Sequence, residues 1–147
     1  MITTIILLGI LGAIISAVLG TFWYSMATPM GRLHMRSLGF DKLSEEEKKK
    51  MIKEAKPHMW KSYLLQMFLS FLTSAFIAGI MLYQKSMTSA VYGEIFAIWL
   101  CFTVPLIGQA LIWNNHDRKL ALKKFFSDGL FNLVVFLVIA FVFSLII

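Results

Sequence analysis

The sequence predicts an all-α fold: an integral membrane four-helix bundle with a short amphipathic cytoplasmic helix between spans one and two. Hydrophobic residues make up 59% of the 147 residues and charged residues 15%, whereas average soluble domains have roughly half and a quarter. Charged residues are absent from four windows, each holding an apolar run of the ~17–25 residues that cross a bilayer: 1–31, 62–84, 95–116 and 129–147. These runs lack the polar stripe of a soluble helix and the alternation of a barrel strand.

The four predicted spans are residues 5–24, 63–82, 95–113 and 129–147, which together form a single membrane domain over residues 1–147. At ~1.5 Å of rise per residue, each span covers close to the ~30 Å of a bilayer's hydrocarbon. A cleaved signal peptide is the alternative for the first span. The absence of a basic segment before it and the length of its apolar run oppose that alternative.

The positions of Lys and Arg predict the orientation. Of the fourteen, nine lie between spans one and two, four between spans three and four, and one between spans two and three. Basic residues concentrate in cytoplasmic loops, so we expect both basic connections in the cytoplasm and both termini outside the bacterial cytoplasmic membrane. The expected partners are the lipid bilayer and anionic lipid headgroups, and no nucleic acid, because no recognised binding module accompanies the charge.

A short helix is predicted over residues 45–56 in the first basic connection. Ser44 and Glu47 have capping-box spacing, and Pro57 should end this helix or start the next because it lacks a backbone donor. We interpret the segment as an amphipathic helix on the inner membrane surface. A docking helix for a cytoplasmic partner is the alternative.

Small residues recur along one side of the first span, at positions that let another helix approach closely. The helix-packing residues are Gly9, Gly12, Ala13, Ser16 and Gly20. This pattern predicts helix–helix association, as a homo-oligomer or with other membrane proteins. Amphipathic aromatic rings favour membrane interfaces, so we expect the following residues to act as interfacial anchors: Trp23, Tyr24, Trp60 and Trp113.

Uncharged polar side chains within the later spans form a candidate polar pocket. Its residues are Gln66, Ser70, Thr73, Thr103, Gln109 and Asn132. Pro105 in the third span frees a backbone carbonyl and favours a kink beside them. Two interpretations stay open: the amides hydrogen-bond one another across the bundle, or they line a pocket for a neutral ligand.

Several chemistries lack support in the sequence. The spacing of His34, His58 and His116 matches no metal-ligand pattern, so no metal or cofactor is expected. The lone Cys101 cannot form an internal disulfide. No ionisable residue falls in the apolar centre of a span, which opposes a proton-driven transporter. We therefore expect no enzymatic activity and no catalytic residue.

Particular motifs resemble those of the DUF1761 family, small bacterial four-span membrane proteins of unknown function. They are GTFWYS at residues 20–25, YLLQ at 63–66, and a W-L-x-F pattern at 99–102 followed by Pro105. The family tends to place proline directly after WYS, whereas this chain has Met26 there and Pro29 later. The resemblance implies the four-span architecture, and it supplies no activity and no catalytic residues.

Three functional hypotheses follow. The first is a non-enzymatic protein that acts by helix–helix association as an oligomer or as an accessory subunit of a membrane complex. The second is a small transporter or channel for a neutral or lipid-like solute, built around the candidate polar pocket. The third, with the least support, is a lipid-modifying enzyme that uses His116 and Asp117.

Overall fold

The computed structural model describes residues 1–84, 89–112 and 117–147, and within these ranges it is helical, with no strand. The elements in chain order are α1 (Ile2–Trp23), α2 (Pro29–Ser37), a short 3-10 helix (Phe40–Lys42), α3 (Glu45–Gln84), α4 (Ser89–Ile98), a π-helical segment (Trp99–Thr103), α5 (Val104–Ile112) and α6 (Arg118–Ser144). The predicted all-α fold is confirmed.

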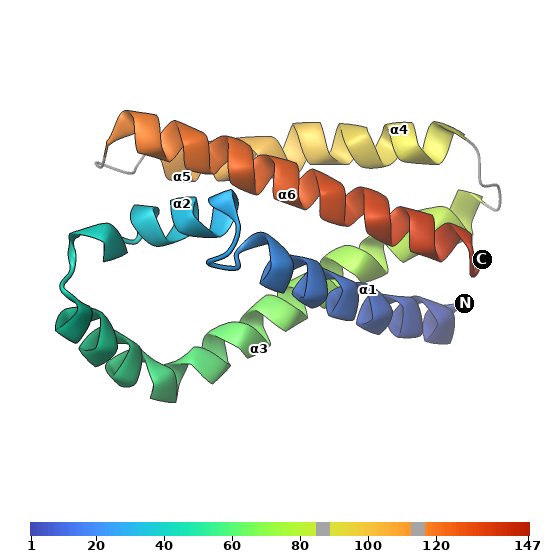
Figure 1. The fold of residues 1–147 in the computed structure, drawn as a ribbon. Coiled ribbons are helices and arrows are strands. Elements are labelled where there is room, and N and C mark those ends of the chain that lie inside the picture. The colour runs from blue at the N-terminus through green and yellow to red at the C-terminus, as the bar shows by residue number, and fades with distance from the viewer. Residues whose placement is uncertain (85–88, 113–116) are drawn as a thin grey trace.

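Four helical stretches in the described part of the chain are long and apolar enough to cross a membrane. They are Ile2–Trp23, Met59–Gln84, Ala90–Gln109 and Arg118–Ser144. Both termini lie at one end of the bundle, and α2, the start of α3 and the start of α6 lie at the other (Figure 1). This placement is the one expected of a chain that crosses a membrane an even number of times.

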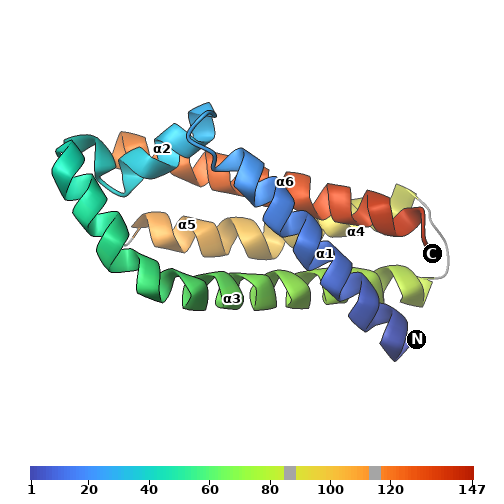
Figure 2. The ribbon, with the colours of Figure 1, turned by 60° about the horizontal axis from the view of Figure 1, so that its bottom comes forward.

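α1 crosses α3 and packs against it (Figure 2) because glycines bring the two backbones together. A Cβ atom added at Gly9 would lie 2.8 Å from Phe71 Cε2, and one added at Gly12 would overlap the side chain of Ser74. Gly9, Gly12 and Ala13 are buried. Gly9 and Gly12 of the small-residue rows therefore pack against another helix of the same chain, whereas a Cβ atom added at Gly20 would lie 3.6 Å from Phe131 Cζ of α6.

The apolar core lies in the half of the bundle that carries the termini. Residues from α1, α3, α4 and α6 build it. Its most deeply buried large side chains are Phe143, Ile95, Ile139 and Val91. Toward the opposite end of the bundle, α3 diverges from the other spans (Figure 1).

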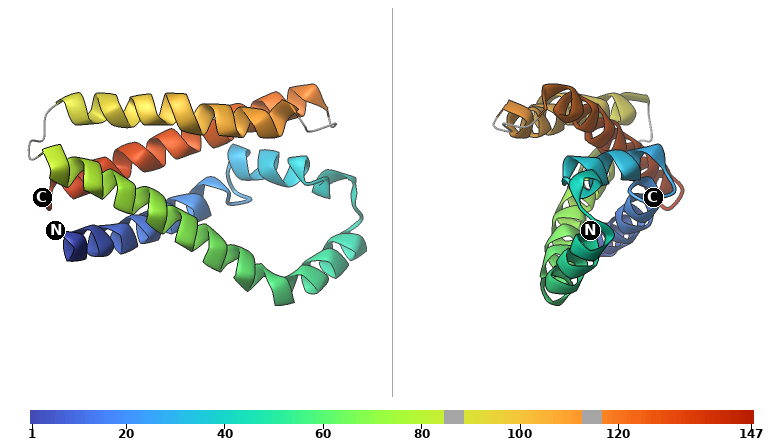
Figure 3. Two further views of the ribbon diagram at one scale, coloured as in Figure 1. Left: turned by 180° about the vertical axis from the view of Figure 1, so that it is seen from behind. Right: turned by 60° about the vertical axis from the view of Figure 1, so that its left-hand side comes forward.

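The helix expected over residues 45–56 is not separate from the second span. α3 runs without a break for 40 residues and contains Pro57. Proline removes one hydrogen bond and crowds the preceding turn, so it kinks a helix without always ending it. The first part of α3 turns away at an angle (Figure 3). The predicted capping box forms: Glu47 N donates to Ser44 Oγ (3.3 Å) and Ser44 N donates to Glu47 Oε2 (2.8 Å).

The third span contains a π-helical segment just before Pro105, where the sequence favoured a kink. A wider turn of this kind accommodates a residue that cannot donate a backbone hydrogen bond. Within the segment, Trp99 Nε1 donates to the carbonyl oxygen of Gly129 at 2.9 Å. This hydrogen bond ties the third span to α6.

α2 was not predicted from the sequence. Thr28 caps it by accepting a hydrogen bond from Gly31 N at 2.9 Å, and Pro29 occupies its first turn. Both residues are standard signals for the start of a helix. α2 folds back along α6 (Figure 1), which places His34 beside the fourth span.

Candidate functional site

A cavity of about 870 Å³ lies between α1, α3 and α6, and α2 and α5 each contribute one lining residue. Its wall is mixed, with apolar side chains such as Met67, Ile107 and Phe131 beside many polar ones. The polar residues that matter most for the chemistry are Tyr24, His34, Gln66, Ser70, Asp128 and Asn132. The cavity is thus amphipathic and lies mostly among helices that are apolar enough to span a membrane.

The structure brings four of the six predicted pocket residues to this cavity. Gln66, Ser70 and Thr73 line it from α3, and Asn132 lines it from α6. Residues at i, i+4 and i+7 share one face of a helix, which explains the α3 set. Thr103 and Gln109 do not line the cavity, where Ile107 is the one lining residue among the described side chains of their span.

The amide–amide hydrogen bonds that the sequence suggested do not occur among the described residues. Asn132 Nδ2 donates instead to the carbonyl oxygen of Asp128, one turn earlier in α6, at 2.8 Å. Gln66 and Gln109 are both exposed. Pairing of these amides across the bundle is therefore not what positions the helices.

Asp128 is the centre of the polar end of the cavity. Its Oδ1 atom accepts a hydrogen bond of 2.9 Å from the hydroxyl of Tyr24, and its Oδ2 atom pairs with the ammonium of Lys124 one helical turn away. Beside them, Trp23 Nε1 donates to Ser127 Oγ at 3.3 Å. The end of α1 is thus fastened to α6 through two aromatic residues.

His34 lies next to this group. Its ring is 5.0 Å from the ring of Tyr24, centroid to centroid, and its Nδ1 atom is buried with no hydrogen-bond partner in the described part of the chain. Burial, with a smaller contribution from the charge of Lys124, lowers the pKa of His34. The imidazole is therefore neutral at pH 7 and presents one donor and one acceptor.

Gly31 explains how α2 reaches this position. A Cβ atom at Gly31 would lie 2.7 Å from the carbonyl oxygen of Tyr24 and would overlap the backbone of Ser25. Only glycine allows α2 to lie this close to the turn after α1. Because His34 follows Gly31 by three residues, this contact sets its place at the cavity.

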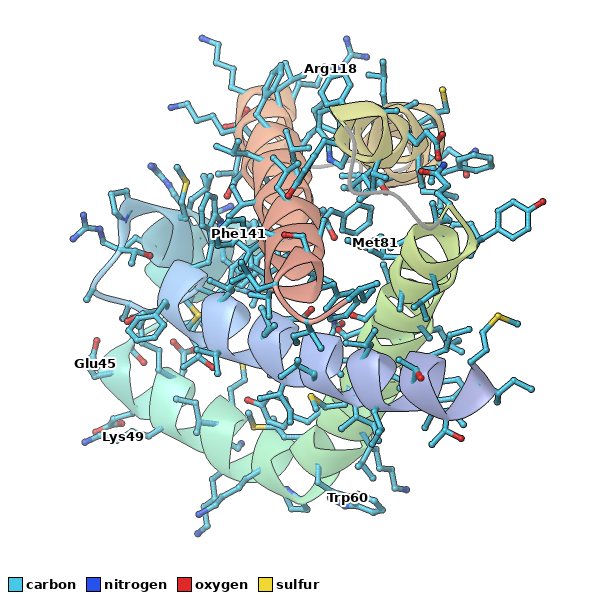
Figure 4. All side chains as sticks on the ribbon, turned by 90° about the vertical axis from the view of Figure 1, so that its right-hand side faces the viewer. Glu45, Lys49, Trp60, Met81, Arg118 and Phe141 are labelled. Atoms are coloured by element: carbon cyan, nitrogen blue, oxygen red, sulfur yellow. The ribbon has the colours of Figure 1, made fainter. Side chains whose placement is uncertain are left out.

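The predicted interfacial anchors fall into three groups. Trp23 and Tyr24 direct their polar atoms onto α6. Trp60 is 57% exposed at the bend of α3, pointing away from the other helices, with Lys61 Nζ 5.9 Å from its ring centroid (Figure 4). Trp113 lies outside the described residues, as does His116 of the lipid-modifying hypothesis.

A family model described as "Protein of unknown function (DUF1761)" matches residues 8–144 of the chain. The chain belongs to the DUF1761 family. The resemblance seen in its sequence motifs is therefore confirmed. No curated protein and no solved structure matches the chain.

Sequence reasoning missed the charged part of the site in this DUF1761 protein. Asp128 precedes the uncharged run of the fourth span, and Lys124 and His34 were read as loop and interface residues. One signal was present, since Lys124 and Asp128 have the i, i+4 spacing of a helical ion pair. Across the described residues, no group of three or more His, Cys, Asp or Glu side chains could hold a metal ion.

Proposed function

We propose that this membrane protein binds a small neutral or lipid-like molecule in the cavity between α1, α3 and α6. The observation that carries the proposal is the cavity itself, whose polar and apolar walls meet within the span region. Its volume of about 870 Å³ falls in the range of roughly 300–1,000 Å³ typical of small-molecule sites. An amphiphile has a polar part and an apolar part, so it makes favourable contacts with both the polar and the apolar wall.

Access from the bilayer supports a lipid-like ligand. Tyr63, Gln66 and Leu69 line the cavity, and each is exposed on the side of α3. An exposed amide among apolar residues gains a hydrogen-bond partner when a ligand with a polar head arrives from the membrane. A molecule dissolved in the bilayer therefore reaches the cavity sideways.

Binding fits better than conduction. The half of the bundle beyond the cavity is filled by the core, in which Ile139 is 1% and Phe143 0% exposed. This packing supports a site that is open at one end and closed toward the termini. A transport step requires this core to rearrange.

We further propose that the polar end of the cavity faces the cytoplasm. The segments with thirteen of the fourteen Lys and Arg residues begin at or near the end opposite the termini (Figure 3), and cytoplasmic loops favour basic residues. The exposed lysines of the first part of α3 suit anionic lipid headgroups. On this orientation the ligand comes from the inner leaflet of a bacterial cytoplasmic membrane.

Association with a second copy or with another membrane protein is a second proposal. The exposed Gln66 favours it, because a neighbouring helix also supplies a hydrogen-bond partner in lipid. Gly9 and Gly12 support it less than the sequence suggested, since α3 of the same chain covers them. An assembly therefore uses other faces of the bundle.

A cavity-filling variant tests the main proposal. Ala17 lines the cavity, whereas its neighbour Val18 is 50% exposed and lies outside it. We expect native mass spectrometry from lipid discs to detect a bound lipid-like molecule on the wild type and on Val18→Phe, and none on Ala17→Phe. Equal retention by the wild type and both variants would show that the molecule binds elsewhere.

A further inference from the structure

The charges at the polar end of the cavity cancel one another. The carboxylate of Asp128 has a partner on each oxygen, the hydroxyl of Tyr24 and the ammonium of Lys124. The imidazole of His34 is mostly neutral at pH 7, because burial and Lys124 together lower its pKa by more than the charge of Asp128 raises it. The site thus offers no uncompensated charge to a ligand.

A charged ligand must break this arrangement. An anionic head competes with Asp128 for Lys124, and a cationic head competes with Lys124 for Asp128. Either competition leaves one ion without its counter-ion in a half-buried site, and the loss of such a charged hydrogen bond lowers affinity about tenfold or more. An uncharged head leaves the ion pair intact.

The polar groups that remain available are uncharged. His34 lines the cavity, and its Nδ1 atom is covered by protein atoms with no hydrogen-bond partner within the described ranges, so a ligand reaches that atom only when the ring shifts. The Gln66 side chain also makes no hydrogen bond to any described residue. An imidazole and a carboxamide each both donate and accept, which matches hydroxyl groups and the carbonyl of an ester.

We infer that the ligand is an uncharged single-chain amphiphile with a hydroxyl-bearing head, an inference that rests on the proposed function. The head lies against His34 and Gln66, and the alkyl chain lies along the apolar wall that includes Phe131, Val135 and Phe136. Ser70 and Thr73 continue the polar wall along α3. A head with several hydroxyls, such as glycerol, makes additional polar contacts with Ser70 and Thr73.

Three photoactivatable probes with the same C16 chain test the headgroup. They are monopalmitoylglycerol, palmitate and hexadecyltrimethylammonium, each with a diazirine on the chain, presented to the protein in phosphatidylcholine discs. Mass spectrometry of the peptides locates the labels. We expect monopalmitoylglycerol to label the cavity peptides of α1, α3 and α6 about tenfold or more above either charged probe.

Matched variants identify the head contacts. Gln66→Leu should lower labelling by monopalmitoylglycerol about 2- to 10-fold, the worth of one hydrogen bond. Gln109→Leu removes another exposed amide, one that does not line the cavity, and should leave labelling unchanged. His34→Phe keeps a ring against Tyr24 but removes the nitrogens, and should lower labelling by a similar factor.

The outcomes separate the two proposals. If palmitate or the quaternary amine labels the cavity as well as monopalmitoylglycerol does, the headgroup inference is overturned and the proposed binding function stands. If no probe labels the cavity peptides, or if Ala17→Phe is labelled as strongly as the wild type, the proposed function itself is wrong.

Discussion

The hydroxyl of Tyr24 donates a hydrogen bond of 2.9 Å to Asp128 Oδ1, which joins the end of the first span to the start of the fourth across 104 positions of sequence. Lys124 pairs with the other carboxylate oxygen, and the ring of His34 lies against the ring of Tyr24 at a tilt of 57°. These contacts form the polar end of the cavity. They combine three segments that are separate in the chain.

Removing the Tyr24 hydroxyl should weaken the contact between the first and fourth spans. For Tyr24→Phe we expect the free energy of unfolding in detergent to fall by about 1.5–3 kcal/mol, because the lost hydrogen bond goes to a charged acceptor. Tyr83→Phe is the matched control, since Tyr83 is 88% exposed. Equal stability of the two variants would mean that the bond to Asp128 contributes little.

The contact between α1 and α3 depends on the absence of a side chain at Gly12. Gly12→Ala should destabilise the protein by about 1–3 kcal/mol, the usual cost of overpacking, because the new methyl group overlaps Ser74. Gly79→Ala meets nothing within 4 Å and should stabilise α3 by about 0.5–1 kcal/mol. Thermal unfolding of the two variants should therefore shift in opposite directions; a shift in the same direction would contradict the packing.

Stability should depend on the protonation of His34. Its pKa in the folded chain lies below the ordinary value of 6.5, so the unfolded chain binds the proton at a higher pH than the folded chain does. The free energy of unfolding should therefore decrease as the pH falls from 7.5 through 6.5 to 5.5.

The variant His34→Phe isolates this effect from the other histidines and from the surrounding Tyr24, Lys124 and Asp128. Its melting temperature should change less than that of the wild type over the same pH range. Parallel curves for the two proteins would show that another group causes the pH dependence.

The orientation can be read by thiol labelling of intact cells. In a Cys101→Ala background, a membrane-impermeant maleimide should label Thr3→Cys, near the amino terminus, without permeabilisation. Lys49→Cys, in the first part of α3, should be labelled only after the membrane is opened. Labelling of Lys49→Cys in intact cells would reverse the proposed topology.

Gly31 provides a test of how α2 positions His34. Gly31→Ala should push α2 away from the turn after α1, because a methyl group there overlaps the backbone of Ser25. We expect monopalmitoylglycerol labelling to fall about 2- to 10-fold, as in His34→Phe, since the same hydrogen bond is lost. Wild-type labelling would show that the position of α2 does not matter for binding.

Part of the candidate site could be predicted from local patterns. Gln66, Ser70 and Thr73 share a helix face, so their common placement follows from helical spacing. Thr103 and Gln109 could not be assigned in the same way, because Thr103 lies in the π-helical segment, where the residue spacing of an α-helix does not hold. His34 and Asp128 depend on α2 folding back along α6, a contact between segments about 90 residues apart.

By itself the sequence determined the all-α class and the four apolar helices, because an uncharged run of about twenty residues favours hydrocarbon wherever it packs. It also determined the capping box at Ser44, which depends on neighbours three residues apart. Only the tertiary structure decided that Gly12 packs inside the chain, that α3 continues through Pro57, and that Tyr24, His34 and Asp128 meet. Those features depend on which helices lie side by side, and no local spacing encodes that choice.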